Sequence, residues 1–120
     1  MEILIVEEDP NLAAIWARHL ARGGARVSVA QDQAAAVARI DAGRLSALVI
    51  DIGLAAGSAV AVADYARFRQ PQARVVLVTA RRFFSDGSIF ALVPNACAYL
   101  PRGTDPADLA TVVDYHARLA

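Results

Sequence analysis

Short apolar runs alternate with longer amphipathic segments along the whole chain. Uninterrupted runs of β-branched and other apolar residues are typical of strands that are buried on both faces of a sheet. The runs that predict strands are Glu2–Val6, Val27–Val29, Ala47–Asp51, Val75–Thr79 and Cys97–Leu100. None of them is long enough to span a bilayer as a helix, which needs about 20 apolar residues. We therefore expect five short strands and no membrane segment.

The segments between the strands carry apolar residues at helical spacing. Each begins at a residue whose side chain can cap a helix, and the five predicted caps are Asp9, Asp32, Ser58, Asp86 and Asp105. Pro10 and Pro106 follow two of these caps at the first helical position, where proline is favoured. Pro94 cuts short the segment that starts at Asp86. The pattern predicts five helices.

Two helices have a predicted apolar side. In the helix after Ser58, the pattern places Val62, Tyr65 and Phe68 on one side. In the last helix, the buried side is Leu109, Val112, Val113 and His116.

Strict alternation of buried strands and amphipathic helices is typical of an α/β fold with a parallel sheet covered on both faces. The length of 120 residues suits one domain, so we expect residues 1–120 to form a single unit. The predicted fold class is a doubly wound α/β sheet.

Composition narrows the range of functions. The 12 basic residues, all arginine, balance 12 acidic residues and are scattered, which is unlike a nucleic-acid-binding surface. The first residues have neither a basic region nor a cleavage site typical of a signal peptide, so we expect a cytoplasmic protein. Cys97 is the single cysteine, which excludes an intrachain disulfide.

Polar side chains follow the predicted strands at their carboxyl ends. Glu7 and Glu8 follow the first strand, Asp51 ends the third and Thr79 ends the fourth, while Arg102 lies just after the fifth. In a parallel sheet of this kind these ends share one edge, where ligands bind. Close carboxylates repel one another, and a hard divalent cation relieves that repulsion. We therefore predict an Mg²⁺ site formed by Glu7, Glu8 and Asp51.

The same edge has the groups needed for phosphoryl transfer. A carboxylate such as Asp51 can attack phosphorus to give an acyl phosphate when the surrounding charges are neutralised. Thr79 could supply a hydroxyl donor and Arg102 a cation. The sequence therefore predicts a phosphoacceptor at Asp51.

Several motifs together resemble the receiver domains of two-component signalling, over the full length of the chain. The stretch Ile3–Pro10 is similar to the family's first strand and acidic pocket, and Leu48–Asp51 to its phosphoacceptor strand, with Gly57 matching a glycine that follows. Val75–Ala80 resembles the strand with the switch threonine. Ala98–Leu100 resembles the segment with the switch aromatic, here Tyr99.

This resemblance implies a flavodoxin-like sheet of strand order 2-1-3-4-5 with five helices. It implies that a histidine kinase or phosphotransfer protein donates a phosphoryl group to Asp51, and that Thr79 and Tyr99 then move. The surface of the fourth helix, fifth strand and fifth helix would change its partners, which are a downstream effector, an output domain or a second copy. The chain's own catalysis would be limited to self-phosphorylation and dephosphorylation, so it is not expected to be an enzyme.

The sequence departs from the family pattern at two site positions. Glu8 replaces the usual aspartate and weakens the predicted metal affinity, and Arg102 replaces a nearly universal lysine. Gly53, Ala80 and Arg81 are predicted to modulate the pocket, with Arg81 and Arg102 compensating for the weakened metal site. These departures leave open an alternative, a pseudo-receiver that binds proteins without phosphorylation. A small flavodoxin-like enzyme is disfavoured, because no glycine-rich phosphate loop follows a strand.

Overall fold

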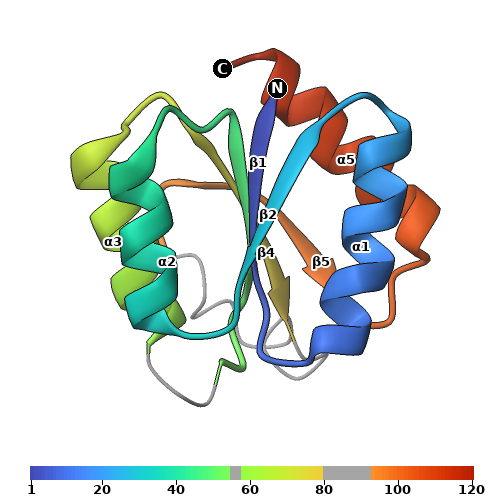
Figure 1. The fold of residues 1–120 in the computed structure, drawn as a ribbon, viewed down its shortest axis with the longest axis horizontal. Coiled ribbons are helices and arrows are strands. Elements are labelled where there is room, and N and C mark those ends of the chain that lie inside the picture. Colours follow the sequence, from blue (N-terminus) through green and yellow to red (C-terminus); the bar gives the residue numbers. More distant parts are fainter. Residues whose placement is uncertain (55–57, 80–92) are drawn as a thin grey trace.

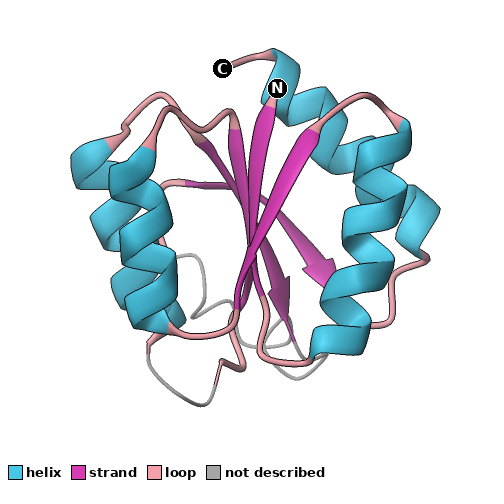
Figure 2. Ribbon diagram, viewed as in Figure 1, coloured by secondary structure: helices cyan, strands magenta, loops and turns pink. Residues whose placement is uncertain are grey.

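Five parallel strands form one sheet in the computed structural model of the chain, which describes residues 1–54, 58–79 and 93–120 (Figures 1 and 2). The strands are β1 (Glu2–Val6), β2 (Arg26–Ala30), β3 (Ala47–Asp51), β4 (Arg74–Thr79) and β5 (Ala96–Pro101). Their order across the sheet is β2-β1-β3-β4-β5. The predicted fold class and strand order are therefore confirmed.

Helices cover both faces of this sheet. The described helices are α1 (Pro10–Arg22), α2 (Gln33–Ala42), α3 (Ala59–Arg69) and α5 (Pro106–Arg118). Helices α1 and α5 lie on one side, and α2 and α3 lie on the other (Figure 1). The helix predicted to begin at Asp86 falls outside the described residues. Within the described segments, no helix has the length and apolar character needed to cross a membrane.

The two faces of the sheet form two separate cores, because alternate side chains of a strand point in opposite directions. On β1, Leu4 and Val6 pack in the core under α2 and α3. Ile3 and Ile5 pack in the other core with the fully buried Trp16 of α1. Burial of every strand residue from Ile3 to Val6 explains the uninterrupted apolar run.

The predicted helix starts that the structure describes are confirmed. The Asp9 carboxylate accepts hydrogen bonds from the backbone N–H groups of Asn11 and Leu12, at 2.9 and 3.3 Å. Asp32 accepts from the N–H of Ala35, Ser58 from that of Ala61 and Asp105 from that of Ala107. Such caps satisfy N–H groups that have no partner within the helix.

One predicted side chain lies on the wrong side of its helix. The buried residues of α3 are Ala59, Val62, Ala63 and Ala66. Phe68 follows Ala66 by two positions, which on an α-helix is a rotation of about 200°. Its side chain is therefore directed away from the core and is 78% exposed. On α5, Leu109 and Val113 are buried as predicted, whereas Val112 and His116 are only half-buried.

Candidate functional site

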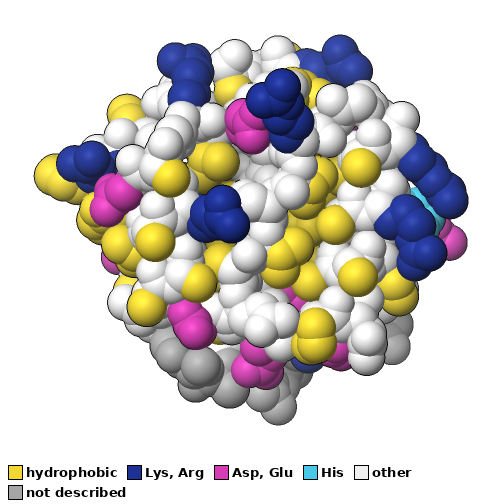
Figure 3. Space-filling view, in the orientation of Figure 1, with side chains coloured by type: hydrophobic (Ala, Val, Ile, Leu, Met, Phe, Trp, Pro, Cys, Tyr) yellow, Lys and Arg dark blue, Asp and Glu magenta, His cyan; other side chains and the backbone are white. Residues whose placement is uncertain are grey.

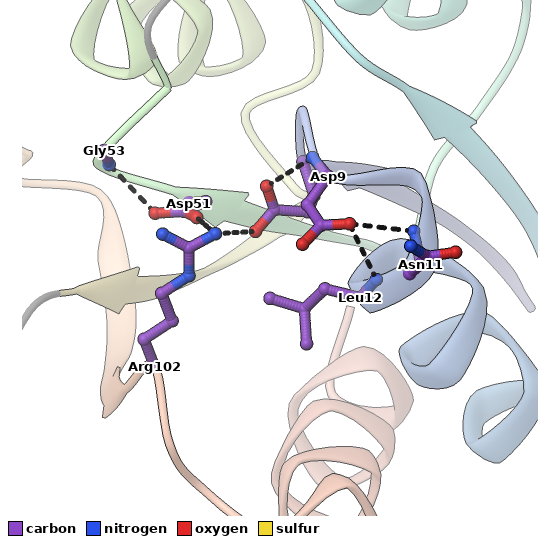
Figure 4. Close-up of polar contacts among 7 residues, drawn as sticks. Asp9, Asn11, Leu12, Asp51, Gly53 and Arg102 are labelled. Carbon is purple, nitrogen blue, oxygen red and sulfur yellow. Dashed lines mark hydrogen bonds and ion pairs between the residues drawn. The ribbon is translucent and has the colours of Figure 1, made fainter.

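The carboxyl ends of the strands bring the candidate polar residues to one edge of the sheet. In the parallel register, Val6 pairs with Ile50, Asp51 with Val78, and Thr79 with Pro101. Residues at the ends of β1, β3, β4 and β5 therefore lie next to one another, although they are far apart in the sequence. Figure 4 shows Asp51 and Arg102 facing each other at this edge.

Asp51 is held at both ends of its carboxylate. The side chain is nearly buried, with 3% of the residue exposed. Its Oδ1 accepts a hydrogen bond from the backbone N–H of Gly53 at 2.9 Å, and its Oδ2 lies 3.5 Å from Nη2 of Arg102 (Figure 4). The backbone contribution of Gly53 was not anticipated from the sequence, because a backbone N–H has no residue signature.

Glu7 is the most buried acidic residue of the site, with no exposed surface. Its Oε2 accepts a hydrogen bond from the backbone N–H of Asp9 at 3.0 Å, and its Oε1 lies 3.4 Å from Nη2 of Arg102. Burial, helped by a hydrogen bond and charge repulsion from Asp51, raises the pKa of Glu7 from 4.5 to about 7. The bonds to Asp9 and Arg102 lower this pKa but do not offset burial.

Arg102 places one cation between two carboxylates. The same nitrogen, Nη2, lies 3.4 Å from Glu7 and 3.5 Å from Asp51. The Arg102 side chain is 45% exposed, so its guanidinium reaches from the surface into a largely buried pair of acids. Its backbone N–H donates to the carbonyl oxygen of Thr79 at 2.9 Å, which fixes the start of the loop that follows β5.

Thr79 places a buried hydroxyl at the same edge. The residue is fully buried, and within the described part of the chain its Oγ1 has no hydrogen-bond partner. Leaving a buried hydroxyl unpaired costs about 1–3 kcal/mol, so such groups are uncommon without a reason. An oxygen-rich ligand bound at this edge would supply the missing acceptor.

Tyr99 lies on β5, opposite Leu77 of β4. Its side chain is half-buried and packs against the core under α2 and α3. The hydroxyl donates to the carbonyl oxygen of Val93 at 3.2 Å. Burial raises the pKa of Tyr99, so the phenol stays protonated and able to donate at neutral pH.

The remaining candidates do not join this group in the described structure. Glu8 is exposed, and among the described residues no three acidic, histidine or cysteine side chains come close enough together to hold a metal ion. The predicted set of Glu7, Glu8 and Asp51 is thus not assembled here, because the side chain after Glu7 turns to the surface. Ala80 and Arg81 lie outside the described residues.

Two of the predicted metal ligands nevertheless suit Mg²⁺. This ion prefers oxygen ligands and is usually bound by one or two carboxylates, with water or phosphate completing its shell. Glu7 and Asp51 provide two carboxylates that contact the same nitrogen of Arg102, at 3.4 and 3.5 Å, an arrangement that a cation stabilises. The chemistry of this pair therefore fits a divalent cation.

Charge on the visible face of the molecule is unevenly distributed. Figure 3 shows acidic side chains along the lower edge of this face, where the strands end, and most of its arginines nearer the top and right.

Comparisons with known proteins agree on one family. Residues 3–114 match the response regulator receiver domain. The transcriptional regulatory protein TcrA of Mycobacterium tuberculosis is 33% identical over 86 residues, which cover 72% of this chain and 34% of TcrA. The match thus spans about a third of the length of that relative.

Two solved structures show the same fold. A CheY-like response regulator receiver domain from Methanospirillum hungatei has a TM-score of 0.86 at 23% identity and covers 98% of this chain and 93% of its own. A response regulator from Burkholderia pseudomallei, solved with a phosphorylated aspartic acid and a calcium ion, has a TM-score of 0.82 at 19% identity, with coverages of 98% and 68%. Together with the sequence match, the strand order and the carboxylates at the ends of β1 and β3, these similarities show that the chain belongs to the response regulator receiver domains of two-component signalling.

Proposed function

We propose that residues 1–120 act as one receiver domain that accepts a phosphoryl group on Asp51 from the phosphohistidine of a histidine kinase or phosphotransfer protein. The observation that carries this proposal is the environment of the Asp51 carboxylate. It lies between the Gly53 N–H and the Arg102 guanidinium. Thr79 ends the neighbouring strand, and its hydroxyl has no partner among the described residues.

Phosphoryl transfer needs a nucleophile and groups that offset the negative charge of the transferred phosphoryl oxygens. An Asp51 oxygen forms the new bond to phosphorus as the bond between phosphorus and the histidine nitrogen breaks. Negative charge on the phosphoryl oxygens is stabilised by the Arg102 guanidinium and by a hydrogen bond from Thr79. The Gly53 N–H keeps the other end of the carboxylate oriented during attack.

Receiver domains typically bind Mg²⁺, and in this chain Glu7 and Asp51 would hold it. The ion would supply further neutralisation of the phosphoryl oxygens. Glu8 remains a predicted ligand that must turn from its exposed position to reach the pocket. A structural relative was solved with a phosphorylated aspartic acid and a calcium ion, which supports both phosphorylation and divalent-cation binding as proposals for this chain.

An effector would recognise the phosphorylated state at the surface that includes β5 and α5. Thr79 would turn its hydroxyl toward the phosphoryl group, and Tyr99 would respond because the two residues lie on adjacent strands. The effector is an output domain, a separate protein or a second copy bound through the fourth helix, β5 and α5. Similarity to part of a transcriptional regulatory protein supports an output domain.

Receiver domains generally act in signalling rather than as dedicated enzymes, and we propose that catalysis by this chain is limited to its own phosphorylation and dephosphorylation. The pseudo-receiver alternative requires a site that never takes phosphate. It is not favoured, because Asp51, Thr79 and Arg102 retain a nucleophile, a hydroxyl and a cation at one edge of the sheet.

Intact mass measurement after incubation with acetyl phosphate and Mg²⁺ tests this proposal. Wild-type protein should gain one phosphoryl group, and Asp51→Asn should gain none. Asp41→Asn is a matched control, because Asp41 lies near the end of α2, at the opposite edge of the sheet, and should leave phosphorylation unchanged.

A second measurement distinguishes two reasons for a missing mass gain, namely that acetyl phosphate does not react with this protein or that the site cannot bind a phosphoryl group. Beryllofluoride should shift the amide resonances of Gly53, Thr79 and Tyr99 in the wild type but not in Asp51→Asn. Absence of both the mass gain and the amide shifts at saturating Mg²⁺ would establish the pseudo-receiver instead.

A further inference from the structure

We propose that the Arg102 guanidinium competes with a divalent cation for the carboxylates of Glu7 and Asp51, so that the cation binds only as Arg102 leaves. This inference rests on the proposed function, since it concerns the cation of the same site. It assigns to Arg102 a second role besides contact with the phosphoryl group, namely that of an internal counter-ion.

The geometry of one nitrogen carries the inference. Nη2 of Arg102 lies 3.4 Å from Oε1 of Glu7 and 3.5 Å from Oδ2 of Asp51. The other oxygen of each carboxylate already accepts a backbone N–H, from Asp9 for Glu7 and from Gly53 for Asp51. A metal ion held by both carboxylates would therefore compete with Arg102 for the same two oxygens. The guanidinium and the ion would then be within a few ångströms of each other, where like charges repel strongly in a buried site.

A metal ion added to Glu7 and Asp51 while Arg102 is still bound would be repelled by its guanidinium. Glu7 has no exposed surface and Asp51 has 3%, so water screens the pocket poorly. Glu8, the third predicted ligand, is exposed, so in the described part of the chain two carboxylates balance the charge of Arg102 before a metal ion binds. Ion pairing to Arg102 therefore has to be given up when the metal ion binds, and this lowers the apparent affinity for the ion.

Arg102 has a route out of the pocket. Its side chain is 45% exposed, and a surface depression of about 420 Å³ is lined by Arg102 itself with Pro101, Gly103 and Thr104. The hydrogen bond from the Arg102 backbone N–H to Thr79 can remain while the side chain rotates into this space. Exchange of the guanidinium for the ion thus requires no change in the sheet.

Linkage makes this competition reciprocal. If the ion pair of Arg102 lowers the affinity for the cation by a given factor, the bound cation weakens that ion pair by the same factor. A phosphoryl group on Asp51 would add acceptor oxygens, so that both cations can then be held at once. The inference therefore predicts a weak Mg²⁺ site before phosphorylation, with Arg102 as the cause.

Titration calorimetry with Mg²⁺ on the whole chain tests this directly. Arg102→Ala and Arg102→Gln should bind Mg²⁺ at least about tenfold more tightly than the wild type, because both remove the competing charge. Arg102→Lys keeps a charge and should stay closer to the wild type. The Gln variant retains a polar side chain, which keeps the test valid if the Ala variant folds poorly.

Arg69→Ala is a matched control for the charge change. Arg69 is 49% exposed and pairs with Asp41 at 3.2 Å, and it ends α3 at the opposite edge of the sheet. This variant removes the same charge from a comparable ion pair, so its Mg²⁺ affinity should equal that of the wild type. A gain in Arg69→Ala as large as that in Arg102→Ala would show a general charge effect and overturn the inference.

A second readout follows the guanidinium itself. In the wild type, the Nε–H resonance of Arg102 should move as Mg²⁺ is added, with the same midpoint as the calorimetric titration. Equal or weaker Mg²⁺ affinity in both neutral variants, including no binding in any variant, would refute the competition. Phosphorylation of Asp51 is measured separately by mass, so either proposal can fail while the other stands.

Discussion

The guanidinium of Arg102 lies 3.4 Å from a carboxylate oxygen of Glu7, a residue 95 positions earlier in the chain. This contact joins the loop after β5 to the end of β1 across the carboxyl edge of the sheet. It also places a half-exposed cation against an acid that has no exposed surface. In this pocket the charge of Arg102 favours an ionised Glu7, whereas burial favours a protonated one. The protonation of Glu7 should therefore affect the stability of the domain.

Glu7 should make the stability of the domain fall as the pH rises. Its pKa is about 7 in the folded chain, against an ordinary value of 4.5, so folding favours the protonated form. The stabilising effect of protonation is complete below about pH 4.5 and is lost as the pH rises through about 7. The full shift corresponds to about 3 kcal/mol as an upper limit.

Urea unfolding at several pH values between 5 and 8 measures this effect. Glu7→Gln should flatten the pH dependence and be more stable than the wild type at pH 8. Glu2→Gln, at the exposed start of β1, is the control and should keep the wild-type slope. An identical pH dependence in Glu7→Gln and the wild type would contradict the assignment.

Asp9 should act as a helix cap and not as a metal ligand. Asp9→Ala removes the acceptor for the N–H groups of Asn11 and Leu12 and should destabilise the protein by about 1 kcal/mol. Asp9→Ser keeps an acceptor and should restore most of that stability. Mg²⁺ affinity should be unchanged in Asp9→Ser, and a large loss there would instead place Asp9 among the metal ligands.

Gln70 should be important for stability although it is remote from the site. Its side chain accepts from the N–H of Leu45 and donates to the carbonyl oxygens of Ile40 and Gly43, at 2.6, 2.7 and 2.6 Å. Gln70→Ala leaves these buried groups unpaired, and we expect a loss of about 2–4 kcal/mol in urea unfolding.

Gln72 offers the matched control for this prediction. It has the same side chain two positions along the chain, and among the described residues its one side-chain hydrogen bond is a long one to Gln70, at 3.4 Å. Gln72→Ala should therefore change stability by less than about 0.5 kcal/mol. Equal effects of the two substitutions would show that the bonds of Gln70 contribute little.

Gly53 should affect the lifetime of a phosphoryl group more than the stability of the fold. A Cβ at this position would lie 3.3 Å from Oδ1 of Asp51, which is a close contact. Gly53→Ala should change the free energy of unfolding by less than about 1 kcal/mol. Because the added methyl restricts water next to Asp51, we expect a severalfold slower loss of phosphate, followed by intact mass after the donor is removed.

The substitution needs a control of the same type elsewhere. Gly103→Ala introduces a methyl into open space and should leave the lifetime unchanged. Faster hydrolysis in Gly53→Ala than in the wild type would mean that the methyl displaces the Asp51 carboxylate instead of shielding it.

Much of the fold could be read from local sequence patterns. The caps at Asp9, Asp32, Ser58 and Asp105 were predicted correctly, because capping depends on backbone groups within three positions of the cap. The buried strands were predicted because continuous apolar runs are required wherever helices cover both faces of a sheet. Phe68 was placed wrongly, since apolar character alone does not show which side of a helix faces the core.

The sequence by itself determined the alternation of strands and helices, and therefore which polar residues end the strands at one edge. Tertiary structure decided what those residues do to one another. Burial of Glu7, the Gly53 N–H at Asp51 and the position of Arg102 between two acids all depend on packing between strands that are distant in the chain. A linear pattern specifies spacing along one element, whereas distances and dielectric surroundings arise only when several elements pack together.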